Sequence, residues 1–100
     1  MFERVMGLNV VDEVIYTKYR ESMTPILNSY NADFGYDFIV SNVLKSKTSE
    51  RINRVFTISF PSKSVMKSFF EDPEYIKVKK KYLDNSIDSK TIISMYETNT

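Results

Sequence analysis

Four side chains in this sequence have the chemistry to bind or transform a small molecule: Tyr19, Tyr36, Asp37 and Arg54. A carboxylate buried away from water is a weaker acid and can act as a general base, so Asp37 is the candidate catalytic residue. Arginine can hold a carboxylate or an enolate through two parallel hydrogen bonds, so Arg54 is a candidate ligand-binding residue. Tyr19 and Tyr36 are further candidates because a tyrosine joins an apolar ring to a hydroxyl group.

Each of these residues also has a purely structural interpretation, which we favour. Arg54 would pair with a nearby acid at the end of its strand. Asp37 would be a hydrogen-bonded residue of an interface between subunits. Tyr19 and Tyr36 would be core aromatics whose hydroxyl groups reach water or a partner. No pair of residues in the sequence requires a catalytic assignment.

A cluster of acids in the segment FFEDPEY (residues 69–75) raises the question of a metal site. Asp72 stands directly before Pro73, which is the arrangement of an N-cap followed by proline at the first helical position. Lysines at positions 77 and 79–81 follow, where cations suit the C-terminal end of a helix. The acids and lysines therefore predict the two ends of one short helix, and we expect no metal.

The composition excludes several classes of protein. The chain contains neither histidine nor cysteine. Ser-His triads, zinc fingers, iron–sulfur clusters and histidine-ligated haem are therefore excluded, and we expect no cofactor. The net charge of +1 predicts no attraction to nucleic acid or to a membrane. The first residues do not resemble a secretory signal, and no apolar run approaches the roughly 20 residues of a membrane span. We expect a cytoplasmic protein.

Hydrophobic periodicity predicts one domain over residues 1–100 with the order βαββαβ. A helix capped by Asp12 should be kinked by Pro25 and end in the segment 29–35. Strands are predicted at 2–10, 34–45, 54–60 and 90–97, with a polar connection at 46–53 and helical segments at 62–70 and 72–81. This order is that of the α+β ferredoxin-like fold, a four-stranded antiparallel sheet with its helices on one face.

The other face of that sheet is unusually poor in lysine and glutamate for a surface open to water. Strict alternation assigns four sets of residues to it: Val5, Gly7 and Asn9; Asp37, Ile39, Ser41 and Val43; Val55, Thr57 and Ser59; and Ile92, Ser94 and Tyr96. The same alternation assigns Tyr36 and Arg54 to the helix-facing side. A second copy of the chain is the simplest cover for the outer face, so we predict a homodimer.

Several motifs resemble those of the dimeric α/β-barrel superfamily, and more narrowly the domain-of-unknown-function family 1330. They are Tyr19-Arg20, Pro25, Phe60-Pro61 and the turn from Phe70 to Tyr75. The resemblance covers nearly the whole chain and implies a dimer in which two sheets face each other. It brings no activity. One departure is at Asn31-Ala32, where the family commonly has glycines.

RNA-recognition domains share the βαββαβ order, so they are an alternative. The segment RVFTISF begins with arginine and has Phe56 and Phe60 at two of the stacking positions. Its other positions do not match, and the charge is close to neutral. We therefore predict a homodimer that binds a small, partly apolar molecule. The alternatives are a cofactor-independent monooxygenase or isomerase, which would share the same pocket, and a purely structural module.

Overall fold

The computed structural model describes residues 1–99, and its elements follow the predicted order. The strands are β1 (Phe2–Val10), β2 (Asp33–Ile39), β3 (Arg54–Phe60) and β4 (Ile87–Glu97). The helices are α1 (Glu13–Ser29), α2 (Lys63–Glu71), α3 (Pro73–Lys81) and the short 3₁₀ helix η1 (Leu83–Asn85). No helix in this part of the chain is both long enough and apolar enough to cross a membrane.

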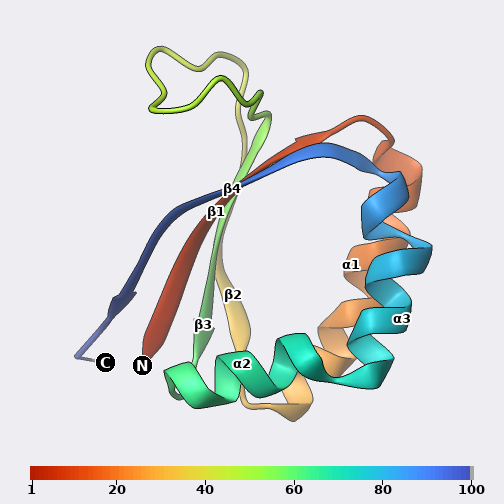
Figure 1. Ribbon diagram of the computed structural model, residues 1–100, viewed down its shortest axis with the longest axis vertical. Coiled ribbons are helices and arrows are strands. Elements are labelled where there is room, and N and C mark those ends of the chain that lie inside the picture. Colours follow the sequence, from red (N-terminus) through yellow and green to blue (C-terminus); the bar gives the residue numbers. More distant parts are fainter. Residues whose placement is uncertain (100) are drawn as a thin grey trace.

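The strands form one antiparallel sheet in the order β2-β3-β1-β4. In Figure 1 the helices all lie to one side of this sheet, with α1 and α3 side by side and α2 joining the far end of β3 to α3. The α+β ferredoxin-like architecture predicted from the sequence is confirmed.

A β-bulge in β2 reverses the predicted sidedness of its residues. Phe34 pairs with Ile58 and Asp37 pairs with Phe56, so two residues of β2 stand opposite Thr57 alone. The bulge occurs at Gly35, where a Cβ atom would lie only 2.5 Å from the Thr57 hydroxyl oxygen. The backbone N–H of the next residue, Tyr36, donates to that oxygen at 2.8 Å.

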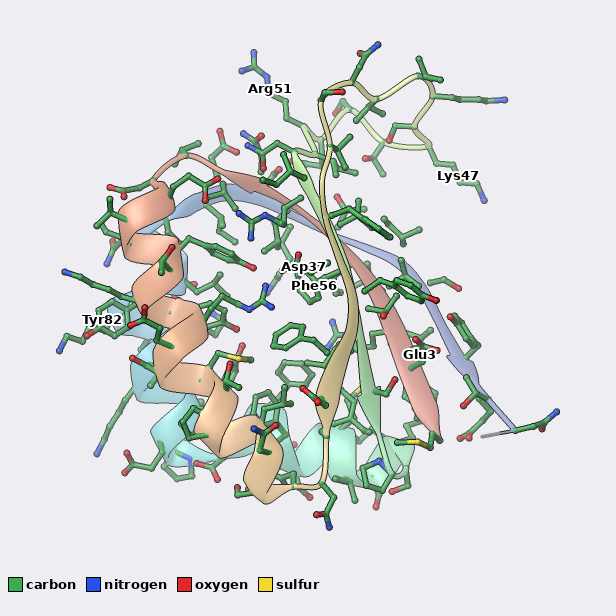
Figure 2. The ribbon with its side chains drawn as sticks, turned by 180° about the vertical axis from the view of Figure 1, so that it is seen from behind. Glu3, Asp37, Lys47, Arg51, Phe56 and Tyr82 are labelled. Atoms are coloured by element: carbon green, nitrogen blue, oxygen red, sulfur yellow. The ribbon has the colours of Figure 1, made fainter. Side chains whose placement is uncertain are left out.

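The predicted placements of Tyr36, Asp37 and Ile39 are therefore wrong. After the bulge, Asp37 lies on the helix-facing side with Phe56, while Glu3 lies on the other side of the sheet (Figure 2). Tyr36 and Phe38 are exposed outside, with their rings stacked at a centroid distance of 5.7 Å. The outer face thus carries two large aromatic rings that strict alternation had assigned to the core.

A second irregularity changes the outer face along β4. Val5 pairs with Ser94, but the next residue of β1, Met6, pairs with Ile92. Ile93 is the extra residue, so Ile92 lies on the side of Met6 rather than on the predicted outer face. The strand pairing supports the predicted placement of the remaining residues on that face: Val5, Gly7, Asn9, Val55, Thr57, Ser59, Ser94 and Tyr96.

Strand β2 is shorter than the sequence pattern predicts. It ends at Ile39, opposite the first residue of β3, Arg54. Residues 40–53 form an irregular connection, in which Leu44 is 91% exposed. A strand requires a neighbour to satisfy its backbone groups, and alternating side chains cannot provide one. The predicted extension to residue 45 is therefore wrong.

The predicted helix boundaries follow their local signals closely. The side chains of Asp12, Ser62 and Asp72 each accept a hydrogen bond from a backbone N–H in the first turn of the helix that follows. Helix α1 continues through Pro25 to Ser29 rather than being interrupted there. Asn31 adopts a left-handed backbone (φ 57°), and asparagine tolerates this conformation.

Asp72 does more than cap α3. One of its carboxylate oxygens accepts from the backbone N–H of Glu74 at 2.8 Å, and the other accepts from the Tyr30 hydroxyl at 2.6 Å. The hydrogen bond from Tyr30 lowers the pKa of this carboxyl, with smaller contributions from the backbone. Asp72 is thus a helix cap, as the sequence predicted, and it also bonds to Tyr30 at the C-terminal end of α1.

We expect Asp72 to make part of the protein's stability dependent on acid. A carboxyl with a lowered pKa in the folded state stabilises above its unfolded pKa, about 3.8, and this stabilisation is lost as the pH falls through the folded pKa. Wild type should therefore have a higher Tm than Asp72→Asn at pH 7, with the difference shrinking below about pH 4. Thermal unfolding from pH 7 to pH 2.5 measures this. Tyr30→Phe, which removes the hydroxyl donor, should reduce the same difference, and a pH-independent gap would contradict the assignment.

Candidate functional site

A cavity of about 340 Å³ lies between the sheet and the helices. It is bounded by β1 and β3 on the sheet side and by α1 and α3 on the helix side. Its apolar walls consist of Met6, Leu8, Met23, Phe34, Phe56, Ile58, Phe70 and Leu83. Its polar lining consists of Arg4, Tyr16, Tyr19, Tyr75, Lys79 and Lys90. A mostly apolar concave site with a few polar groups is the usual form of a small-molecule pocket.

The walls follow from the periodicity of each element. Met6 and Leu8 alternate on β1, and Phe56 and Ile58 alternate on β3, so both pairs face the helices. On α1, Tyr16, Tyr19 and Met23 recur at helical spacing and are buried against the same space. These regular spacings explain which side chains line the cavity, but they do not show that a space remains between them.

Tyr19 lies in this cavity and forms a hydroxyl pair with Tyr75. Their oxygens are 2.9 Å apart and buried. Burial raises the pKa of Tyr75 and, together with the neighbouring Tyr75, raises the pKa of Tyr19 well above its usual value. Both groups are therefore un-ionised at neutral pH. Only one hydroxyl can donate within the pair, so the second hydrogen is free for an acceptor on a bound molecule.

Three cations line the same cavity, and none of them was predicted from the sequence as a ligand-binding residue. Arg4 extends from β1, Lys79 from α3 and Lys90 from β4. Burial lowers the pKa of both Arg4 and Lys90. The signal for Arg4 was present in the sequence, because it shares the alternation of Phe2, Met6 and Leu8 on a strand whose inward side is otherwise apolar.

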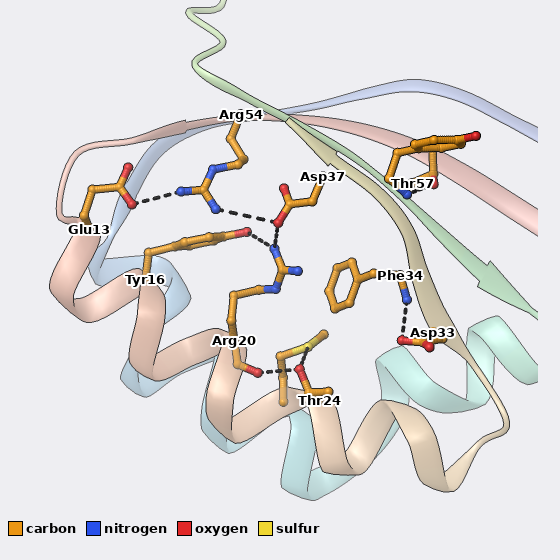
Figure 3. A network of polar contacts seen from close by, with 11 residues as sticks. Glu13, Tyr16, Arg20, Thr24, Asp33, Phe34, Asp37, Arg54 and Thr57 are labelled. Carbon is orange, nitrogen blue, oxygen red and sulfur yellow. Dashed lines mark hydrogen bonds and ion pairs between the residues drawn. The ribbon is translucent and has the colours of Figure 1, made fainter. Parts of the chain in front are cut away.

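A polar network holds α1 to the edge of the sheet, outside the cavity. Arg54 pairs with Glu13 at 2.9 Å and with Asp37 at 3.9 Å. Arg20 donates to Asp37 at 2.9 Å and to the Tyr16 hydroxyl at 3.2 Å. Figure 3 shows the two guanidinium groups on either side of the Asp37 carboxylate. Two acids and two arginines thus balance each other at the junction of α1 with β2 and β3.

The four candidate residues predicted from the sequence do not meet in one place. Tyr19 lines the cavity, whereas Asp37 and Arg54 line an open groove beside α1, and Tyr36 lies on the outer face. The pairing of Arg54 with local acids agrees with the structural interpretation given above. Phe56 and Phe60 face the helices rather than an open sheet face, so they do not form the stacking surface of an RNA-recognition domain.

The acidic and basic side chains do not form a metal-binding constellation. Across residues 1–99, no three of the aspartate and glutamate side chains gather closely enough to hold a metal ion. Of the three acids of the FFEDPEY segment, Glu71 is the last residue of α2, whereas Asp72 caps α3 and Glu74 lies in its first turn.

Comparisons with known proteins place the chain among uncharacterised relatives. The sequence pattern of a family described as a domain of unknown function (DUF1330) matches residues 4–96. No curated protein matches the sequence. Among solved structures, a protein of unknown function from Rhodopseudomonas palustris matches with a TM-score of 0.78 at 13% identity, over 99% of this chain and 82% of its own.

Two further structures share the fold at low identity. A dimeric protein of unknown function with a ferredoxin-like fold, from Bacteroides fragilis, matches with a TM-score of 0.63 at 15% identity, over 97% of this chain and 95% of its own. A candidate antibiotic biosynthesis monooxygenase from Nitrosomonas europaea matches with a TM-score of 0.58 at 8% identity, over 98% of this chain and 89% of its own.

Proposed function

Because this chain belongs to the DUF1330 family, whose description names no activity, we propose a function from its cavity: the protein is a homodimer that binds a small, partly apolar molecule. The observation that carries this proposal is the cavity of about 340 Å³, with apolar walls and a pair of buried tyrosine hydroxyls. This volume is near the lower end of the roughly 300–1,000 Å³ range of ligand pockets, which favours a small ligand.

The dimer rests on the outer face of the sheet. Tyr36 is 65% exposed and Phe38 is 54% exposed, and they stack on each other beside the small residues of β3. Exposed aromatic rings of this size favour a partner surface. The dimeric ferredoxin-like protein from Bacteroides fragilis supports a second copy of the chain as that partner. In this arrangement the cavity lies on the far side of each sheet from the interface.

The alternative function is cofactor-independent monooxygenation or isomerisation of the bound molecule. It is favoured by the neutral tyrosine hydroxyls and the cations of the cavity, which could stabilise an enolate, and by the shared fold of the candidate monooxygenase. Asp37 engages Arg20 outside the cavity, so a base other than Asp37 would be needed. Oxygen uptake with an apolar hydroquinone under air, above the rate without protein, distinguishes the monooxygenase from a binding protein.

Methionine methyl NMR tests the binding proposal with 1-octanol as the probe. The chain has five methionines, of which Met6 and Met23 line the cavity. We expect 1-octanol to shift the Met6 and Met23 methyl signals in a saturable way. Met66 and Met95, which do not line the cavity, serve as internal controls. Shifts confined to Met95, or no saturable shift at the two cavity methionines, would rule out the cavity as the binding site.

A further inference from the structure

The charges around the cavity are of one sign. Arg4, Lys79 and Lys90 reach it from three different elements, and no aspartate or glutamate is among the residues that line it. The tyrosine hydroxyls that complete its polar lining are neutral at physiological pH. Cations beside an apolar space reduce the stability of the fold unless an anion binds there, because burying a charge without a partner is costly.

Of the three cations, Arg4 has the clearest need for an acceptor on a bound molecule. Its guanidinium lies over the ring of Phe70, with the central carbon 4.6 Å from the ring centroid. Its Nε atom is buried and has no hydrogen-bond acceptor within residues 1–99. The side chain is half-buried, and the described part of the chain provides it with no carboxylate partner. A planar guanidinium group without a carboxylate partner can donate two parallel hydrogen bonds to the two oxygens of a carboxylate.

The two lysines add to the same positive field. Lys79 is held by Asp84, with a nitrogen-to-oxygen distance of 3.1 Å, while Lys90 has no ion pair within the described residues. Burial and then the charges of Lys79 and Arg4 lower the pKa of Lys90. All three cations line the one cavity. Asp84 supplies one negative charge beside the three positive charges of Arg4, Lys79 and Lys90, so the net charge around the cavity remains positive.

We propose that the molecule bound in this cavity is an apolar carboxylic acid in its anionic form, with its carboxylate on Arg4 and its apolar body against Met6, Met23, Phe56 and Ile58. This inference rests on the proposed function and specifies the class of ligand. The carboxylate would occupy the donors of Arg4, and the spare hydroxyl hydrogen of the Tyr19–Tyr75 pair would serve as a further donor. Lys79 and Lys90 would contribute by charge.

Two probes that share an apolar chain separate this inference from simple apolar binding. Octanoate and 1-octanol are titrated at neutral pH, where octanoate is ionised, and binding is followed at the Met6 and Met23 methyl signals. We expect octanoate to bind wild type at least about tenfold more tightly than 1-octanol, since a hydrogen bond to a charged group has about that effect on affinity or more. Arg4→Met should remove this preference by weakening octanoate binding much more than 1-octanol binding.

The controls cover the surface charge and the fold. Lys80→Met removes a lysine of α3 that does not line the cavity and should keep the preference for octanoate. Lys90→Gln provides a second cavity variant and should weaken octanoate binding more than 1-octanol binding. Circular dichroism checks that each variant is folded.

The two possible failures differ in what they overturn. Equal affinity for octanoate and 1-octanol in wild type, or a preference that survives Arg4→Met, would overturn the anionic ligand and leave the binding function standing. If neither probe reaches the cavity methionines, the proposed function itself fails.

Discussion

Replacing Phe69 by alanine is expected to lower the free energy of unfolding by about 3–5 kcal/mol, the usual cost of removing a fully buried aromatic side chain. Phe69 is 0% exposed. Its ring contacts those of Tyr30, Phe60, Phe70 and Tyr75, at centroid distances from 4.4 to 5.8 Å. The side chain thus joins β3, α2 and α3 to the C-terminal end of α1, and its removal would leave a cavity in a close-packed core.

The loss would be a large share of the total stability, since a domain typically has about 5–15 kcal/mol. Urea unfolding followed by circular dichroism at one fixed protein concentration measures it, because stability depends on concentration if the chain is dimeric. Phe69→Leu, which keeps most of the volume, should cost distinctly less. Val14→Ala, at an exposed position on α1, should change stability by no more than about 0.5 kcal/mol. A loss below about 1 kcal/mol for Phe69→Ala would contradict the packing described here.

Replacing Phe38 by glutamate is expected to convert the proposed dimer into monomers. The ring of Phe38 stacks on that of Tyr36, and both rings are exposed on the outer face of the sheet. In a symmetric dimer the substitution occurs on both subunits, so two carboxylates would be buried without partners. We expect the dissociation constant to rise by at least about 100-fold, which corresponds to roughly 2.8 kcal/mol.

Sedimentation equilibrium over a range of micromolar concentrations measures the change. The variant should sediment as a monomer of 11.7 kDa, and wild type should sediment with twice that mass. Val14→Glu provides the matched control, since it places the same charge at an exposed apolar position on α1, away from the outer face. Wild type that is monomeric at these concentrations, or a Phe38→Glu protein that dimerises normally, would refute the proposed interface.

The order of elements could be predicted from the sequence because each element carries its own local signal. The alternation of Phe56, Ile58 and Phe60 identifies β3, and the caps at Asp12, Ser62 and Asp72 mark where the helices begin. These signals depend on neighbours within a few residues. They need no knowledge of the rest of the fold.

The sidedness of β2 could not be predicted in the same way. A bulge adds one residue to one strand, and only the partner strand shows where. Here it depends on Gly35 meeting the Thr57 hydroxyl from β3. Strict alternation beyond Gly35 predicted Tyr36 on the helix-facing side and Asp37 on the outer face, and the structure has the reverse. The roles predicted for the two residues depended on those positions. The homodimer prediction does not depend on that exchange, because the corrected face carries more exposed aromatic surface than the predicted one.

The cavity shows a different limit of sequence reasoning. The alternation of β1 places Arg4 on the helix-facing side. Counting only the apolar residues of a strand leaves such a charged residue out. Lys79 and Lys90 had no such signal, since in the sequence they are indistinguishable from lysines on a solvated face. In the fold, β4 lies beside β1, and Lys79 of α3 lines the same cavity, so the three charges come together.

The order of strands also has a consequence for how the chain folds. β1 is an inner strand, and its two neighbours, β3 and β4, come from the middle and the end of the sequence. Contacts between segments so far apart close large loops, which slows folding. During synthesis, β1 must wait for β3 before its first edge is paired and for residues 87–97 before its second, so the Arg4 side of the cavity is completed only when the last strand leaves the ribosome.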